Sequence, residues 1–488
     1  NSMSILKSSA PSNSADDLIQ STALDLVASL KNEALSPHDL LDALENRIDE
    51  VDHCINALPT LCFERARITA DQLMRLPINK RGILCGLPVS IKDLNDVKGV
   101  RTTMGSSVFV NHTSVESDYM VGQLEKEGAI VYAKSNTPEF GAGGNTFNEV
   151  FGATRNPWDL RMSVAGSSGG AAASLSSGTS WLAQGSDNAG SLRSPASFCS
   201  IVGMRPSFGR VAMGPSATPF ESMSVNGPMA RNVEDLALLL DAMAAEDFRD
   251  PFSLLKPETS FLKIAQTRKK PLKVAFSQDL GITPVEAEIA EICKRAALKF
   301  EEMGIVVEEK CPDFSGVHES YQTLRAKDFA VSLGDLNRAQ PNKLKPEIIG
   351  NIEQGLNLSL DEIAKAELKR GQLRNRAVNF FDDYDLLLCP TSIVAPYPVD
   401  NRYVSSCTGV NFENYIDWLA IVYAITLVSL PALSLPCGYT KSGLPVGLQM
   451  IARPRGDAEL LSYALKLEES LSLDLKPIDP IKKRLGNE

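Results

Sequence analysis

The chain has 488 residues, 43% of them hydrophobic, and a formal net charge of −11 at pH 7. A chain of this length can bury an extensive core. Its acidic balance excludes the basic footprint with which proteins bind nucleic acids or anionic membranes. The charge therefore predicts neither nucleic acid nor a membrane as a partner, and it does not indicate the substrate. Apart from the charge, we expect a small-molecule substrate, and we allow for a homodimer.

The nine cysteines are scattered and form no Cys-x-x-Cys pair. This distribution favours reduced, buried thiols in a cytoplasmic protein over a disulfide framework or a zinc site. Cys199 follows Ser191 by eight residues and is a rival nucleophile, which we expect instead to pack in the core. The N-terminus lacks a basic patch followed by an apolar run, so we expect no secretory signal.

The first part of the chain has the pattern of helices. Apolar residues recur at helical spacing from Ala15 to about Arg75, and the pair Ser36-Pro37 is a predicted cap. Later segments are predicted, in chain order, as strands at 83–92 and 129–133, a small-residue helix at 171–177, a strand, an amphipathic helix and a strand at 272–276, 285–303 and 306–309, and further strands at 384–391 and within 433–448. Strands alternating with helices indicate an α/β fold.

The longest apolar stretch runs from Trp418 to Leu430. It is too short to span a bilayer comfortably, and Pro431 and Pro436 interrupt its continuation. We interpret it as a buried helix followed by a strand. Together the predicted elements indicate an α/β protein.

Two serine- and glycine-rich turns flank an apolar run between residues 163 and 196. The first reads Gly-Ser-Ser-Gly-Gly at 166–170, and the second reads Gly-Ser-Asp-Asn-Ala-Gly-Ser-Leu-Arg at 185–193. Such turns place hydroxyls among backbone amides that small residues leave uncovered, which a covalent acyl-transfer site needs. Upstream, Leu-Pro-Val-Ser-Ile-Lys-Asp at 87–93 ends a strand-like run on a lysine.

These segments resemble the amidase signature family of serine hydrolases, and the bacterial amidases among them. Further agreement comes from Gly-Ala-Thr-Arg-Asn-Pro-Trp at 152–158 and Leu-Pro-Val-Gly-Leu-Gln-Met-Ile-Ala-Arg at 444–453, so the resemblance spans most of the chain. It implies a catalytic triad of Ser191 as nucleophile, Ser167 in a cis peptide bond as proton relay, and Lys92 as base. It also implies the amidase signature fold, an α/β protein with a mixed central β-sheet covered by helices on both faces.

The residues themselves are consistent with a lysine base. A serine hydroxyl needs a base within hydrogen-bond reach, and none of the four histidines, His38, His53, His112 and His318, lies in the serine-rich segment. A lysine can serve if burial lowers the pKa of its amine. Because Lys92 follows a strand pattern that enters the core, we expect such burial.

The turn before Ser191 offers donors for an oxyanion hole. The candidates are the backbone N–H groups of Asn188, Ala189, Gly190 and Ser191. The commoner family pattern has a glycine where Ala189 stands, and an alanine disfavours positive φ. Three further residues are expected to support the site: Ser168, Asp187 and Arg193. We expect Asp187 and Arg193 to form a charged pair, and the alternative is that Arg193 receives a substrate carboxylate.

A Gly-x-Ser-x-Gly sequence at 166–170 raises a second interpretation, an α/β-hydrolase esterase with Ser168 as nucleophile. That fold places an acid and then a histidine after the serine, and His318 is the histidine downstream of Ser168. No phosphate-binding Gly-x-x-x-x-Gly-Lys-Ser/Thr motif occurs. The chemistry of the triad calls for no cofactor and no metal.

The expected function is hydrolysis of a carboxylic amide, other than a peptide bond, to the acid and ammonia or an amine. The alternative within the family is the glutaminase-type subunit of a tRNA-dependent amidotransferase. The turn sequence Asn-Ala-Gly-Ser at 188–191 is more similar to amidases acting on small or cyclic amides, including oligoamide hydrolases. We expect a helical region at 15–75 and one catalytic domain at 76–475, in which the segment from about 246 to 382 shapes the substrate pocket.

Overall fold

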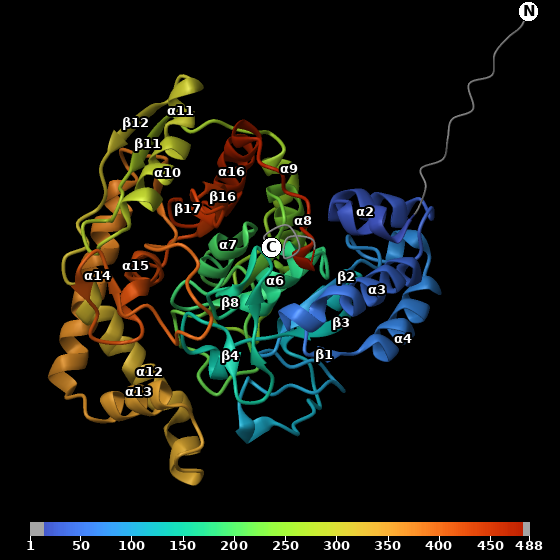
Figure 1. Cartoon of the computed structure of the whole chain (residues 1–488), viewed down its shortest axis with the longest axis horizontal. Coiled ribbons are helices and arrows are strands. Elements are labelled where there is room, and N and C mark those ends of the chain that lie inside the picture. The colour runs from blue at the N-terminus through green and yellow to red at the C-terminus, as the bar shows by residue number, and fades with distance from the viewer. Residues whose placement is uncertain (1–13, 482–488) are drawn as a thin grey trace, which may run out of the picture.

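A computed structural model describes residues 14–481 of the chain (Figure 1). The expectation of no secretory signal concerns the first residues, 1–13, which lie outside the described part. An 11-stranded mixed sheet forms the centre, in the order β1-β3-β2-β8-β10-β9-β16-β17-β13-β11-β12. Its strands are β1 (Thr60–Leu61), β2 (Pro88–Lys92), β3 (Ile130–Ser135), β8 (Leu182–Asp187), β9 (Val202–Arg205), β10 (Val225–Ala230), β11 (Lys273–Phe276), β12 (Val306–Glu309), β13 (Leu386–Pro390), β16 (Ala432–Tyr439) and β17 (Pro445–Ile451).

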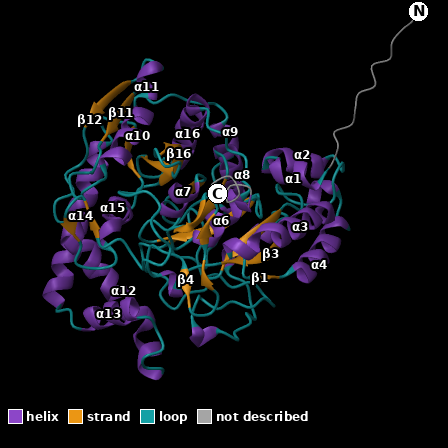
Figure 2. Cartoon of the chain, viewed as in Figure 1, coloured by secondary structure: helices purple, strands orange, loops and turns teal. Residues whose placement is uncertain are grey.

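Helices surround this sheet, as Figure 2 shows. They are α1 (Ala15–Gln20), α2 (Ala23–Lys31), α3 (Pro37–Ile55), α4 (Phe63–Met74), α5 (Tyr119–Lys126), α6 (Gly169–Ser176), α7 (Ser194–Cys199), α8 (Val233–Met243), α9 (Phe261–Ala265), α10 (Ala287–Ala297), α11 (Lys299–Glu302), α12 (Val317–Ala339), α13 (Pro346–Leu356), α14 (Leu360–Phe380), α15 (Ala420–Val428) and α16 (Asp457–Leu471). Three ribbons pair β4 (Phe147–Asn148) with β5 (Gly152–Ala153), β6 (Arg155–Asn156) with β7 (Asp159–Ser163), and β14 (Ser406–Cys407) with β15 (Val410–Asn411). The predicted fold class, an α/β protein with a mixed central sheet, is confirmed.

The strands that carry the site lie in the interior of the sheet. Strand β2 pairs in parallel with both β3 and β8, and all five of its residues are buried. Strands covered on both faces in this way read as near-continuous apolar runs, as β13 does with Leu-Leu-Leu-Cys-Pro. Because β2 and β8 run parallel, their carboxyl ends, Lys92 and Asp187, emerge at the same edge of the sheet.

The N-terminal region is helical, as predicted, but in four pieces. Ser36 caps α3 with a reciprocal pair of hydrogen bonds to Asp39, and Pro37 occupies the first turn, where its missing N–H has no helical partner to lose. Between α3 and α4 the chain extends so that β1 can pair with β3. The hydrogen bonds between Ser36 and Asp39 confirm the predicted cap at Ser36-Pro37.

Two predicted elements are shorter than expected. The strand predicted from residue 83 begins only at Pro88, because Cys85 and Gly86 adopt positive φ angles of 53° and 102° that a strand cannot contain. The helix predicted over 285–303 divides at Leu298 into α10 and α11. The strands on either side, β11 and β12, pair in parallel as the strand–helix–strand pattern requires.

Helices α12, α13 and α14 form the left and lower part of the molecule in Figure 1. Helix α12 packs on α13, α14 and α15, and α14 also packs on α15. The predicted buried helix after Trp418 is α15, every residue of which is buried, and it leads into β16. Within residues 14–481, no helix has both the length and the apolar character that crossing a bilayer requires.

Candidate active site

The site forms where the ends of β2 and β8 meet the loop that leads into α6. Lys92 is the last residue of β2, and Ser186 and Asp187 end β8. The loop between β7 and α6 contains a cis peptide bond between Gly166 and Ser167, as the family resemblance implies for Ser167. Three segments that are far apart in the sequence thereby bring a lysine and several serines together.

The amine of Lys92 lies at the centre of these serines. Its Nζ is 2.6 Å from Ser167 Oγ, 2.8 Å from Ser168 Oγ and 2.9 Å from Ser186 Oγ. The side chain is fully buried, and this burial lowers the pKa of Lys92 to about 7, against the opposing effect of the Asp187 carboxylate. A substantial share of the amine is therefore neutral near pH 7 and able to accept a proton. We call Lys92, Ser167, Ser168 and Ser186 the serine network.

Ser168 supports this network from a fully buried position. Its hydroxyl donates to the backbone carbonyl of Ser186 at 3.1 Å, and its oxygen accepts from the backbone N–H of Ser186 at 3.2 Å. Because the proton of Ser168 is directed to that carbonyl, Lys92 donates to Ser168 Oγ. This leaves the nitrogen lone pair of a neutral Lys92 for the hydroxyl proton of Ser167.

The contacts of Ser168 and His318 disfavour the α/β-hydrolase interpretation. The two ring nitrogens of His318 lie within hydrogen-bond distance of the Tyr423 hydroxyl and the Ile282 carbonyl. The hydrogen bonds of Ser168 go to Lys92 and Ser186 instead. Ser168 is thus a supporting residue of the lysine and has no histidine partner among the described residues.

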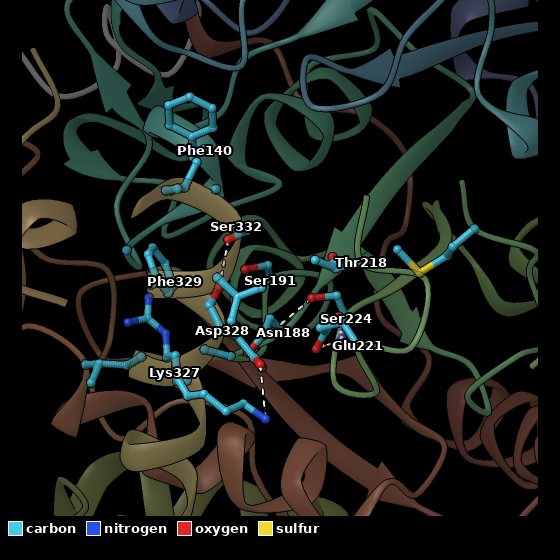
Figure 3. Close-up of a pocket in the computed structure, with 18 of the residues that line it drawn as sticks. Phe140, Asn188, Ser191, Thr218, Glu221, Ser224, Lys327, Asp328, Phe329 and Ser332 are labelled. Atoms are coloured by element: carbon cyan, nitrogen blue, oxygen red, sulfur yellow. Dashed lines mark hydrogen bonds and ion pairs between the residues drawn. The ribbon is translucent and has the colours of Figure 1, made fainter. Parts of the chain in front are cut away.

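Ser191 reaches a cavity of about 600 Å³. Ser191 is 6% exposed, and the neighbouring Asn188 and Ala189 line the same cavity. Figure 3 shows Ser191 and Asn188 facing side chains of α12, among them Asp328 and Phe329. Of the candidate serines, Ser191 is therefore the one placed to meet a ligand in this cavity, since Ser167 and Ser168 do not line it.

A buried ion cluster holds the turn that carries Ser191. The Asp187 carboxylate pairs with Arg193 at 2.9 Å and with Arg205 at 3.0 Å, and it accepts the N–H groups of Gly190 and Leu192. Burial alone would raise the pKa of Asp187, but the two guanidinium groups hold that pKa well below its usual range. The predicted pair of Asp187 and Arg193 is confirmed. Arg205 was not among the predicted site residues, because apart from its charge no sequence pattern around it indicates a contact with Asp187.

Arg193 is not placed to receive a substrate carboxylate. Its side chain is fully buried and lines no described cavity. Besides Asp187, its guanidinium donates to the Val422 carbonyl, the Gln449 side chain and the Thr426 hydroxyl. These hydrogen bonds occupy the donors of the guanidinium group and stabilise the turn.

The backbone of this turn narrows the candidates for the oxyanion hole. Gly190 takes the positive φ of 93°, whereas Ala189 does not, so an alanine is accommodated at 189 without strain. A Cβ at Gly190 would lie 2.3 Å from Val422 Cγ2, which makes glycine necessary there. The N–H of Gly190 already donates to Asp187, while the backbone N–H groups of Asn188, Ala189 and Ser191 have no acceptor among the described residues.

Asn188 is held by two residues that the sequence analysis did not single out. The Tyr321 hydroxyl donates to Asn188 Oδ1 at 2.6 Å, and Asn188 Nδ2 donates to Ser224 Oγ at 2.9 Å. Tyr321 belongs to α12, in the segment 246–382 that the sequence analysis assigned to the substrate pocket. Residues 325–333 of the same helix supply much of the cavity wall. Cys199, the rival nucleophile, is fully buried in the core as expected.

Comparison with known proteins shows the family of the chain. The sequence profile of the amidase family matches residues 39–461. The chain belongs to the amidase signature family. It is 35% identical to an acylamidase of Rhodococcus erythropolis over 468 residues, 94% of this chain and 98% of that protein. It is 32% identical to a glutamyl-tRNA(Gln) amidotransferase subunit of Moorella thermoacetica over 480 residues, 93% of this chain and 97% of that protein.

A solved structure shows the same fold. A bacterial aryl acylamidase of the amidase signature family superimposes with a TM-score of 0.87 at 26% identity, covering 92% of this chain and 96% of that one. The mixed sheet and its helices are thus the amidase signature fold. As a member of this family, the protein is an amidase-type hydrolase.

Proposed function

We propose that the protein hydrolyses a carboxylic amide through an acyl-enzyme on Ser191. The observation that carries the proposal is the 2.6 Å contact between Ser167 Oγ and the fully buried Nζ of Lys92. A buried lysine with its pKa lowered to about 7 is suited to general-base catalysis at neutral pH. Such a lysine next to a serine, beside a cavity that contains a second serine, provides the parts of a serine nucleophile with a relay.

The proton moves in two transfers as the nucleophile attacks. Ser191 Oγ bonds to the carbonyl carbon and gives its proton to Ser167 Oγ, while Ser167 gives its own proton to the neutral amine of Lys92. When the tetrahedral intermediate collapses, the C–N bond breaks, and the proton returns through Ser167 to the leaving nitrogen. Water then attacks the Ser191 ester through the same relay and releases the acid.

The negative charge of the tetrahedral intermediate requires donors on the carbonyl oxygen. We assign this role to the N–H groups of Asn188, Ala189 and Ser191, which have no protein acceptor among the described residues. Asn188 completes the turn, and Gly190 shapes it with its positive φ. Removal of one such donor in other serine hydrolases costs about 2.7–4 kcal/mol of transition-state stabilisation.

The proposed substrates are amides other than peptide bonds, linear or cyclic, with ammonia or an amine as the product. Activated esters share the carbonyl chemistry and need less help for the leaving group, so they also react. The cavity of about 600 Å³ is lined by apolar and polar side chains and suits a small organic amide. The names of the relatives, an acylamidase and an aryl acylamidase, support this class of substrate.

The test is active-site labelling with a fluorophosphonate, followed by mass spectrometry of the digested protein. We expect the adduct on Ser191. The Ser191→Ala protein should bind no probe and hydrolyse no para-nitroanilide. An adduct on Ser168, with an active Ser191→Ala protein, would contradict the proposal.

An amidotransferase subunit is the second candidate, because the Moorella protein of that name is 32% identical over nearly the whole chain. Such a subunit would hydrolyse glutamine and pass ammonia to a partner. A direct test measures ammonia release from glutamine and from simple amides by the purified chain alone. Turnover of simple amides without a partner supports the amidase, whereas activity confined to glutamine supports the amidotransferase subunit.

A further inference from the structure

Arg325 on α12 lies in a wall shared by two cavities. One is the cavity of about 600 Å³ that contains Ser191, and the other, of about 380 Å³, lies between α12, α13 and residues 403–416. Arg325 and Ile416 line both. The residue is 5% exposed, so its charge is largely buried at the border of these two cavities.

The partners of Arg325 are neutral. Its Nη1 donates to Asn351 Oδ1 at 2.7 Å, and its guanidinium lies over the rings of Phe329 and Tyr415 with centroid distances of 4.4 and 5.2 Å. Tyr415 also directs its hydroxyl to Asn351. Among residues 14–481, no carboxylate forms an ion pair with Arg325.

The positive charges of other buried arginines are compensated by carboxylates or by several carbonyl oxygens. Arg193 and Arg205 share the Asp187 carboxylate, and Arg210 pairs with Asp457 at 3.4 Å. Arg231 donates to four backbone carbonyls, those of Leu175, Ser180, Ile19 and Ser21. Burying a charge is costly unless it is paired and hydrogen-bonded. Arg325 therefore differs from the buried arginines that stabilise the fold.

Most other charged groups of the two cavities have charged partners. The exception is Glu221 in the first cavity, whose carboxylate accepts the backbone N–H groups of Met223 and Ser224 and pairs with no cation among the described residues. In the second cavity, Glu347 accepts two hydrogen bonds of 2.6 Å from Arg402. In the first, Lys327 lies 3.6 Å from both Asp328 and Glu367. Arg325 is thus the cation in these walls that faces open space without a counter-ion, in the described part of the chain.

We propose that the amide substrate carries a carboxylate and that Arg325 binds it while the amide carbonyl lies at Ser191. The planar guanidinium matches the two oxygens of a carboxylate, and its neutral partners hold it in place without neutralising it. This specificity rests on the proposed amidase function. The carboxylate belongs either to the acyl part or to the amine part of the substrate, and both positions present the same chemistry.

The experiment compares matched substrates on the purified protein. One arm uses para-nitroanilides of dicarboxylic acids from succinic to suberic and their methyl esters, so that the acyl part is anionic or neutral. The other arm uses acetyl-para-aminobenzoate and its methyl ester. We expect kcat/KM to favour the anionic member by about 10- to 100-fold in one arm, the range of a hydrogen-bonded charge pair.

Two variants test whether Arg325 is the cause. Arg325→Gln should abolish the preference for the anionic substrate and leave kcat for the neutral one within about threefold. Asn351→Asp, which places a carboxylate beside an intact Arg325, should abolish the preference in the same way and provides the answer if Arg325→Gln does not fold. Arg376→Gln on α14 removes an equal charge that is paired with Asp313 on the surface, and it should keep the preference.

The two proposals fail in different ways. Failure of the wild-type protein to hydrolyse any of these anilides, anionic or neutral, would count against the amidase function. Equal kcat/KM for anionic and neutral substrates in both arms would overturn the role of Arg325. An equal fall for both kinds of substrate in folded Arg325→Gln would also overturn it, because a purely structural residue lowers both alike.

Discussion

The serine network differs in the placement of its charged groups from the cavity wall formed by residues 325–333 of α12, which we call the α12 wall. Lys92 in the network is fully buried among hydroxyl and carbonyl groups, and its pKa is lowered to about 7. Lys327 and Asp328 of the α12 wall keep about a third and a quarter of their side chains exposed and face each other at 3.6 Å. Burial thus lowers the pKa of the reactive amine, whereas the charged side chains of the wall are partly exposed and paired at a longer distance.

This difference separates the residues that carry the chemistry from those that set substrate choice. Groups of the network are fixed by several bonds each, so loss of one should impair catalysis with every substrate. Groups of the α12 wall have few bonds to the rest of the chain, so their loss should alter substrate choice more than chemistry.

Ser191→Ala should lower kcat for amide hydrolysis by more than about 10⁴-fold, because no acyl-enzyme can form. Steady-state kinetics with a para-nitroanilide measure the loss. Ser315→Ala, a serine in the loop before α12, is the matched control and should retain the wild-type rate. Residual activity of Ser191→Ala within tenfold of wild type would rule out Ser191 as the nucleophile.

Lys92→Ala should lower amide turnover by about 10²- to 10⁴-fold, the usual range of general acid–base catalysis. Activated esters should lose less, since a phenolate leaves without the proton that an amine needs. In the wild-type protein, the neutral amine is the active form. Because the pKa of Lys92 is lowered to about 7, kcat/KM should rise with pH through about 7 and then level off.

Lys134→Met provides the control for Lys92, because Lys134 is an equally buried lysine on the neighbouring strand β3 and pairs with Asp93 at 3.1 Å. Its replacement should lower stability but leave the ratio of amide to ester activity unchanged. If a folded Lys92→Ala protein loses both activities equally, Lys92 is a structural donor and the relay is wrong. Thermal unfolding of each variant separates folding from chemistry.

Asp187→Asn should lower the free energy of unfolding by about 3–5 kcal/mol, because it leaves Arg193 and Arg205 buried without a counter-charge. Urea unfolding measures the change. The same substitution at Asp159, which pairs with the exposed Arg161, should cost less than about 1 kcal/mol. Equal costs at the two positions would show that the buried cluster does not hold the turn.

Tyr321→Phe should lower kcat a few-fold with little change in KM, because it removes the hydrogen bond that orients Asn188 in the turn before Ser191. Loss of a typical hydrogen bond costs about 1 kcal/mol. Tyr439→Phe, at a tyrosine that lines neither cavity, should leave kcat unchanged. A rise in KM alone would place Tyr321 in substrate binding rather than in positioning the turn.

Removal of metal ions should have no effect on the rate. Attack, proton relay and oxyanion stabilisation are all assigned to groups of the chain itself. Dialysis against a strong chelator, followed by the anilide assay, measures this. A reproducible loss of activity that added zinc reverses would contradict the proposed chemistry.

Much of the fold was accessible from sequence because its signals are local. Alternating and continuous apolar runs marked most strands, and the cap at Ser36 was visible as a serine before a proline and a helical pattern. The turn geometry at Cys85 and Gly86 was missed, since their positive φ angles have no strong local signature at a cysteine. The break at Leu298 was missed for a similar reason, because both halves share one apolar face.

The family and the candidate residues Lys92, Ser167 and Ser191 could be recognised from the sequence alone, because short motifs with glycine, serine and lysine carry that chemistry within a few positions. Only the tertiary structure decided which atoms meet. It brought Lys92 within 2.6 Å of Ser167, joined Arg205 to Asp187, and left Arg325 facing two cavities. The physical reason is that burial and pairing depend on residues distant in the chain, which no local pattern records.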